Sequence, residues 1–145
     1  MIVFIKLILA HLLGDFVFQP NRWVKAKEAK KFKAYQLYLH LLVHGLLIMI
    51  IMADLSFWPY AVGIISVHGL VDLIKLYAQK ASTKRYWFFI DQLAHLLTIG
   101  GVVVWIDPGF INLLYPISEK FWLVLTLLVF LSLPASIIIK TIISK

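Results

Sequence analysis

Five long apolar stretches dominate the sequence, and each is close to the length that a helix needs to cross about 30 Å of hydrocarbon. They cover residues 2–20, 36–53, 59–78, 88–106 and 121–139. The breaks between them include Pro20, Pro59, Pro108 and Pro116. Hydrophobic residues make up 62% of the chain and charged residues 14%, too little polar material to cover a water-soluble domain of 145 residues. The sequence therefore predicts an all-α integral membrane protein, with five transmembrane helices in one transmembrane domain over 1–145.

Basic residues gather in alternate connections, and this pattern predicts the orientation of the spans. Eleven Lys and Arg residues fall at 22–33, at 80–85 and after 139, whereas the other two connections hold only Lys120. The positive-inside rule then places the N-terminus outside and the C-terminus inside a bacterial cytoplasmic (inner) membrane. The net charge of +7 is thus explained by topology. We expect the lipid bilayer as the partner and no nucleic acid, and a homo-oligomer stays open.

The segment 22–33 holds six of these basic residues. It is either an ordinary positive-inside loop or a short basic amphipathic helix on the inner leaflet that attracts an anionic lipid. The residues alone leave both interpretations open.

Each of the first four spans carries one pair of ionisable side chains four residues apart. The pairs are His11 and Asp15, His40 and His44, His68 and Asp72, and Asp91 and His95. A spacing of four puts both members of a pair on one helix face. An Asp at mid-span costs roughly 2.5–3.5 kcal/mol, so such groups are expected to be paired, metal-bound or next to water.

The predicted topology also brings the four pairs to a similar depth. With a rise of 1.5 Å per residue, all eight groups lie roughly 5–15 Å from the cytoplasmic ends of their spans. We therefore expect four of the five helices to form a bundle with a polar intramembrane site. The order of the motifs in spans one and two resembles that in spans three and four, which is consistent with a repeat of two helical hairpins.

Imidazole and carboxylate groups without thiolates suit a divalent metal, most of all zinc, with manganese or iron as alternatives. The chain has no Cys. All eight groups are candidate ligands, for one metal or for a two-metal centre. Asp15 and Asp91 are also candidate catalytic groups, because a carboxylate that the metal does not fully use can accept a proton from water. These residues predict a metal-dependent hydrolase that acts near the cytoplasmic face on an unknown substrate, lipid-linked or phosphorylated.

Other interpretations of the same residues stay open. The cluster could serve a carrier of metal ions or protons, bind haem, or only join helices through His–Asp hydrogen bonds in a non-catalytic membrane module. Lys75 could contact a substrate phosphate or extend to the membrane boundary. Gln19 and Gln92 could orient ligands or lie at a helix interface. We expect Gly14, Gly45 and Gly69 to allow close helix approach.

These motifs resemble a bacterial family known as domain of unknown function 3307. The resemblance covers the motifs at 11–20, 38–45, 68–75 and 91–95, about two-thirds of the chain. The chain is also similar to small integral-membrane proteins described as membrane-bound metal-dependent hydrolases, which share intramembrane His-x3-Asp motifs. That second resemblance implies a hydrolase but no substrate.

Overall fold

The computed structural model describes residues 1–106 and 117–143, which form helices joined by short turns and contain no strand. Four helical segments in this part of the chain are long and apolar enough to cross a membrane. A fifth span is formed if the bent segment at the N-terminus is counted. The prediction of an all-helical, multi-pass membrane protein is confirmed. The predicted break at Pro108 and Pro116, together with Lys145, lies outside the described residues.

The first span is shorter than predicted and ends in an unusual turn. Helix α1 (Ile2–Leu12) continues as the π-helical turn η1 (Leu13–Val17) rather than to residue 20. The Phe18 N–H donates to the Leu13 carbonyl at 2.8 Å and closes this wide turn. Pro20 then disfavours helical backbone at the residue before it, so the helix stops. The chain turns by 82° into the segment Asn21–Lys33.

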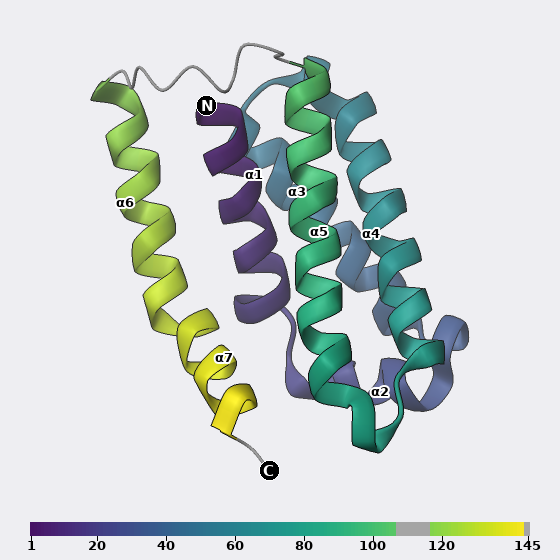
Figure 1. Ribbon diagram of the computed structural model, residues 1–145. Helices are drawn as coiled ribbons and strands as arrows, with labels where there is room; N and C mark the ends of the chain where they lie inside the picture. Colours follow the sequence, from purple (N-terminus) through teal and green to yellow (C-terminus); the bar gives the residue numbers. More distant parts are fainter. Residues whose placement is uncertain (107–116, 144–145) are drawn as a thin grey trace.

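The basic segment is helical. It forms α2 (Asn21–Lys30) and the 3-10 turn η2 (Lys31–Lys33). Figure 1 shows α2 across one end of the bundle, which we call the α2 end. The helical interpretation of this segment is therefore correct, and its contact with anionic lipid stays a prediction.

Four helices form a closed ring. Helices α3 (Tyr35–Met52), α4 (Trp58–Ala78) and α5 (Lys84–Ile106) confirm the second, third and fourth predicted spans to within a few residues. The 3-10 turns η3 (Leu55–Phe57) and η4 (Ala81–Thr83) join them. Helix α1 packs against α3, α3 against α4, α4 against α5, and α5 against α1 (Figure 1).

The interior of the ring differs between its two ends. At the end near the N-terminus it is an apolar core of Leu7, Ala10, Ile48, Phe57, Ala61, Ile64, Ile99 and Val103. The other half holds the ionisable residues. The outer faces expose large apolar side chains such as Leu42, Ile50 and Leu97, as expected for helices that contact lipid.

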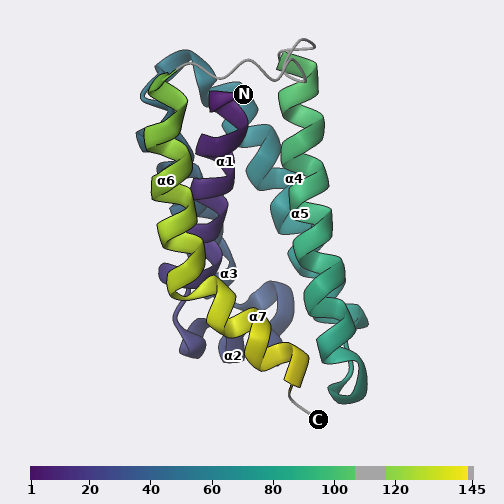
Figure 2. The ribbon, with the colours of Figure 1, turned by 60° about the vertical axis from the view of Figure 1, so that its left-hand side comes forward.

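The fifth predicted span, 121–139, is longer than expected and broken. It consists of α6 (Ile117–Ser132) and α7 (Pro134–Ile143), which meet at Leu133. Pro134 lacks an N–H and clashes with the preceding turn, which explains the break. Helix α6 packs on α1, where the Lys6 ammonium lies 4.7 Å from the ring centroid of Trp122. Helix α7 then leaves the line of α6 and turns beneath the bundle (Figure 2).

Candidate metal centre

The ring brings all eight predicted site residues together in its α2-end half. Seven of them are buried, and the side chain of Asp15 is only 10% exposed. Each pair faces the ring interior because its two members are one helical turn apart. The structure therefore places every candidate ligand in one cluster, here called the His/Asp cluster.

Asp15 lies at the centre of the His/Asp cluster. Its Oδ1 atom is 3.0 Å from His44 Nε2, 3.2 Å from His40 Nε2 and 3.7 Å from His68 Nε2. Its Oδ2 atom accepts a hydrogen bond from Gln92 Nε2 at 3.2 Å and lies 3.8 Å from His11 Nε2. One carboxylate thus touches imidazoles from three helices.

Gly14 allows this arrangement. A Cβ at Gly14 would lie 2.4 Å from the His44 ring, and one at Gly69 would lie 2.8 Å from Leu41 Cδ1. The predicted close approach is confirmed at these two glycines. It is wrong at Gly45, where a Cβ would meet only Ile65 at an ordinary 3.6 Å.

A second part of the cluster connects α3 and α4. The Nε2 atoms of His40 and His68 are 3.1 Å apart, and Asp72 Oδ2 lies 3.8 Å from His40 Nε2. His40 is fully buried, and Gln19 Nε2 lies 2.9 Å from both its Nδ1 and its Nε2. Gln19 therefore contacts a candidate ligand, and its orienting role stays a prediction.

Asp91 and His95 on α5 form the third part. Asp91 Oδ1 and His95 Nε2 are 3.4 Å apart, within ion-pair distance, and His95 Nε2 is 3.7 Å from Asp72 Oδ1. Within the described part of the chain, neither of these two atoms forms a hydrogen bond. Both residues are 2% exposed. A buried polar atom without a partner costs about 1–3 kcal/mol. These two atoms are thus available to a ligand that is not a protein group.

Two lysines complete the site, and the sequence did not predict their roles. Lys27 Nζ donates to Asp72 Oδ2 at 2.6 Å, and Lys75 Nζ donates to Asp91 Oδ2 at 2.7 Å. The sequence predicts Lys27 in the basic connection, yet its side chain is buried because α2 folds under the ring. The sequence predicts Lys75 either at a substrate phosphate or at the membrane boundary. Its position one turn after Asp72 was the one available signal for a contact within the site.

The donor atoms fit a divalent metal. Three overlapping groups have ligand atoms within 4.8 Å of one another: His11, Asp15, His44 and His68; His40, His68 and Asp72; and Asp15, Asp91 and His95. In a tetrahedral zinc site with bonds near 2.0–2.1 Å, ligand atoms are about 3.3 Å apart. The separations of 3.0–3.7 Å around Asp15 Oδ1 are close to that value. Asp15 and His68 each belong to two of these groups, so the residues could hold one metal or two.

The cluster lies between a large open pocket and a small cavity. Asp15, Asp72 and Asp91 line the open pocket of about 1040 Å³ at the α2 end. On the other side, His11, His44, His68 and His95 line a cavity of about 10 Å³ beneath the apolar core. The carboxylates therefore face the opening, and most of the imidazoles lie behind them.

Comparison with known families assigns the chain to one of them. The family described as "Protein of unknown function (DUF3307)" matches residues 3–124, most of the chain, and the protein belongs to this family. The match includes all eight residues of the His/Asp cluster and ends within α6. No curated protein and no solved structure matches the chain.

Proposed function

We propose that this member of the family is a membrane-embedded, metal-dependent hydrolase whose metal is held by the His/Asp cluster. The observation that carries the proposal is the group of Asp15, Asp91 and His95, in which Asp91 Oδ1 and His95 Nε2 are buried without a hydrogen bond. Asp15 and Asp91 of this group also line the open pocket. Buried polar atoms normally find partners, and exceptions are explained by a functional role, an ordered water or an ion. A pocket lined by two members of the group is what a hydrolase requires.

The residues divide into two roles in this proposal. Imidazoles and carboxylates of the three overlapping groups hold the metal, with zinc first and manganese or iron as alternatives. A divalent metal at these ligands supplies Lewis acidity and makes water easier to deprotonate. Asp15 is surrounded by imidazoles and serves mainly as a ligand. Asp91 has one oxygen that accepts no hydrogen bond, which makes it the better candidate to accept a proton from the attacking water.

In this proposal the α2 end faces the cytoplasm, with the N-terminus outside and the C-terminus inside a bacterial inner membrane. The basic residues of α2, η2 and the α4–α5 connection support this orientation. The substrate then reaches the site from the inner leaflet or the cytosol.

The apolar core supports a hydrolase over a carrier. Between the cluster and the other end of the ring, the facing residues of α1, α3, α4 and α5 are apolar, from Leu7 to Val103. A carrier of metal ions or protons needs a polar path across the membrane. The competing interpretation is a non-catalytic network, because Lys27 and Lys75 already neutralise two of the three carboxylates.

Metal content distinguishes these two functions. The full chain is purified in detergent without added metal or chelator, and its metals are measured by elemental analysis. We expect about one or two equivalents of a divalent metal, most of all zinc, and a fall in thermal stability on chelation. His68→Ala, which removes a ligand shared by two groups, should retain less than about 0.2 equivalents. Lys30→Ala, at an exposed position of α2, is the control and should keep its metal.

A wild-type protein with less than about 0.2 equivalents of every metal, and with stability unchanged by chelators, would contradict the hydrolase. The polar-network interpretation would then replace it.

A further inference from the structure

The open pocket has walls of two kinds. Its volume of about 1040 Å³ is at the upper end of the range for small-molecule sites. Four cationic side chains line it: Lys27, Lys75, Lys84 and Arg85. Apolar side chains also line it, among them Phe16, Val24, Leu76, Phe88, Leu133 and Ile137. A ligand that fills this pocket contacts both positive charge and apolar surface.

Three of the four cations already have acidic partners. Lys27 pairs with Asp72, Lys75 pairs with Asp91, and Lys84 Nζ lies 2.5 Å from Glu28 Oε1. Within the described residues, Arg85 has no acidic partner, although it lines the same pocket. A guanidinium group binds phosphate oxygens in pairs, which a lysine ammonium does not do. Arg85 is therefore the available anchor for a phosphate group.

The second polar anchor lies deeper on the same helix. Asp91 and Arg85 both line the pocket, and six residues of α5 separate them by about 9 Å along the helix axis. An extended arginine side chain and one phosphate group can bridge that length. Asp91 Oδ1 in turn lies 3.4 Å from His95 Nε2, so the pocket extends from Arg85 to the edge of the His/Asp cluster.

Helix α7 supplies part of the apolar wall. The break at Pro134 turns α7 beneath the bundle (Figure 2). Leu133, at the break, and Ile137 of α7 line the pocket while remaining 46% and 37% exposed. An inorganic phosphate ion would not need this wall, and a neutral lipid would not need the cations. Since α7 belongs to a segment apolar enough to lie in the bilayer, the wall is continuous with surface suited to hydrocarbon.

We infer that this pocket binds a phosphate head group carried on a long apolar chain. This makes a long-chain phosphate monoester the substrate class of the hydrolase, a step that rests on the proposed function, whereas the binding itself does not. In the hydrolysis, the oxygen of one water bonds to phosphorus and the P–O bond to the chain breaks. The long-chain alcohol leaves with one proton, and inorganic phosphate keeps the other.

Binding is tested with the full chain in nanodiscs of zwitterionic lipid, with a chelator present, so that the result does not depend on metal. The probes are hexadecyl phosphate, butyl phosphate and inorganic phosphate, and thermal stability reports binding. We expect hexadecyl phosphate to bind at least about 30-fold more tightly than butyl phosphate, because its additional methylenes are buried.

Matched variants test the contributions of the cationic wall and the apolar wall to binding one at a time. Arg85→Gln should weaken hexadecyl phosphate binding about tenfold, whereas Arg22→Gln, at an exposed position on α2 outside the pocket, should not. Ile137→Trp should fill the apolar part and reduce the binding of the long-chain phosphate alone. Ile139→Trp, on an exposed face of α7 outside the pocket, should leave it unchanged.

Three outcomes would overturn the inference: no binding of hexadecyl phosphate, equal binding of inorganic phosphate, or no effect of Arg85→Gln. A protein that carries metal but fails to bind hexadecyl phosphate would keep the hydrolase and lose this substrate class. A protein that binds hexadecyl phosphate but carries no metal would support the binding site and contradict the hydrolase.

Discussion

Among the glycines that the structure describes, Gly14 is the one whose backbone lies directly against a candidate metal ligand, the His44 ring. A methyl group there would lie 2.4 Å from the His44 ring, which itself contacts Asp15 at 3.0 Å. Gly14→Ala should therefore displace His44 and lower metal affinity about 10–100-fold, the size of effect that follows when the support of a ligand is disturbed. Competition with a metal-sensitive dye measures this change.

Gly100→Ala is the matched control, because a Cβ there meets nothing within 4 Å. This variant should bind metal as the wild type does. Undiminished affinity in Gly14→Ala would show that His44 is not a ligand.

The sequence predicts which His and Asp residues cluster in the site, but not which lysines pair with its carboxylates. The spacing of four identifies all eight clustered residues, because helix geometry alone puts both members of each pair on one face. The partners of Asp72 and Asp91 depend on packing between elements, since Lys27 comes from a different helix and Lys75 reaches across to α5. On sequence grounds, three aspartates at roughly 2.5–3.5 kcal/mol each need a partner to offset their burial, and a metal is one such partner. With lysines beside Asp72 and Asp91, Asp15 is the carboxylate that has only imidazoles and the Gln92 amide as partners, so direct measurement of the metal is the decisive test.

At the scale of elements, α2 is held against the ring by polar contacts to α4 and α5. Lys27 reaches Asp72, Lys31 donates to the Leu76 carbonyl, and Glu28 pairs with Lys84 at the start of α5. The Lys27–Asp72 contact is the buried one of these three. Helix α2 thereby forms one side of the open pocket.

Loss of the Lys27 charge should loosen this element. Lys27→Met leaves Asp72 as a buried charge without its partner, which typically costs about 3–5 kcal/mol. We expect a clear fall in the thermal unfolding midpoint, measured in detergent. The double variant Lys27→Met with Asp72→Asn should recover part of the loss, because no unpaired charge remains.

Lys25→Met changes an exposed lysine two residues away and is the matched control. If Lys27→Met and Lys25→Met melt at the same temperature, the Lys27–Asp72 contact does not hold α2.

The elements that the sequence predicts well are those with simple signals. Helices α3, α4 and α5 begin and end near the predicted residues because each is one continuous helix whose residues are mainly apolar. The first and fifth spans differ from expectation for local reasons. The wide turn η1 and Pro20 end the first span early, and Pro134 breaks the last one. A hydropathy pattern averages over such turns and therefore misses them.

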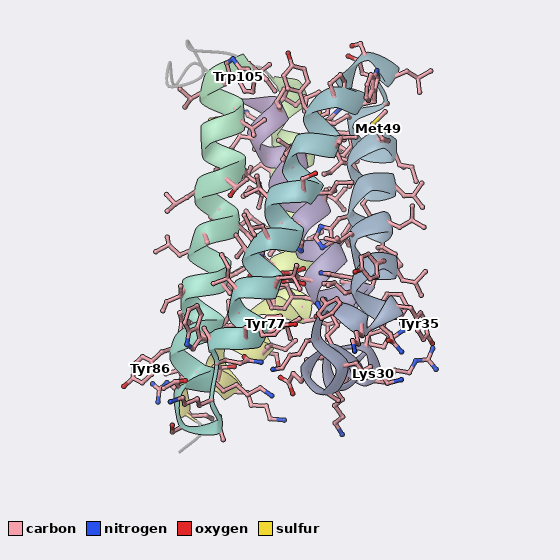
Figure 3. The ribbon with its side chains drawn as sticks, turned by 90° about the vertical axis from the view of Figure 1, so that its right-hand side faces the viewer. Lys30, Tyr35, Met49, Tyr77, Tyr86 and Trp105 are labelled. Carbon is pink, nitrogen blue, oxygen red and sulfur yellow. The ribbon has the colours of Figure 1, made fainter. Side chains whose placement is uncertain are left out.

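At the scale of the whole molecule, the two ends of the bundle have opposite character. Figure 3 shows exposed Tyr35, Tyr77 and Tyr86 near the α2 end and Trp105 near the other end, positions expected for aromatic residues at the two membrane interfaces. Basic side chains such as Lys30 gather at the α2 end (Figure 3). The polar site and its pocket lie in the same half, and the apolar core lies in the other.

This asymmetry leads to a test of orientation that uses the intact protein. The chain has no Cys, so a single introduced Cys is a unique label site. Ser56 in η3 and Ser82 in η4 are both exposed, lie in short 3-10 turns and stand at opposite ends of the ring. With the α2 end in the cytoplasm, Ser56→Cys should react with a membrane-impermeant maleimide in spheroplasts, whereas Ser82→Cys should react only after the membrane is opened. The basic residues near Ser82 are the physical reason, because positive charge is retained on the cytoplasmic side. The reverse labelling pattern would place the pocket on the outer side, and a substrate from the inner leaflet would then be ruled out.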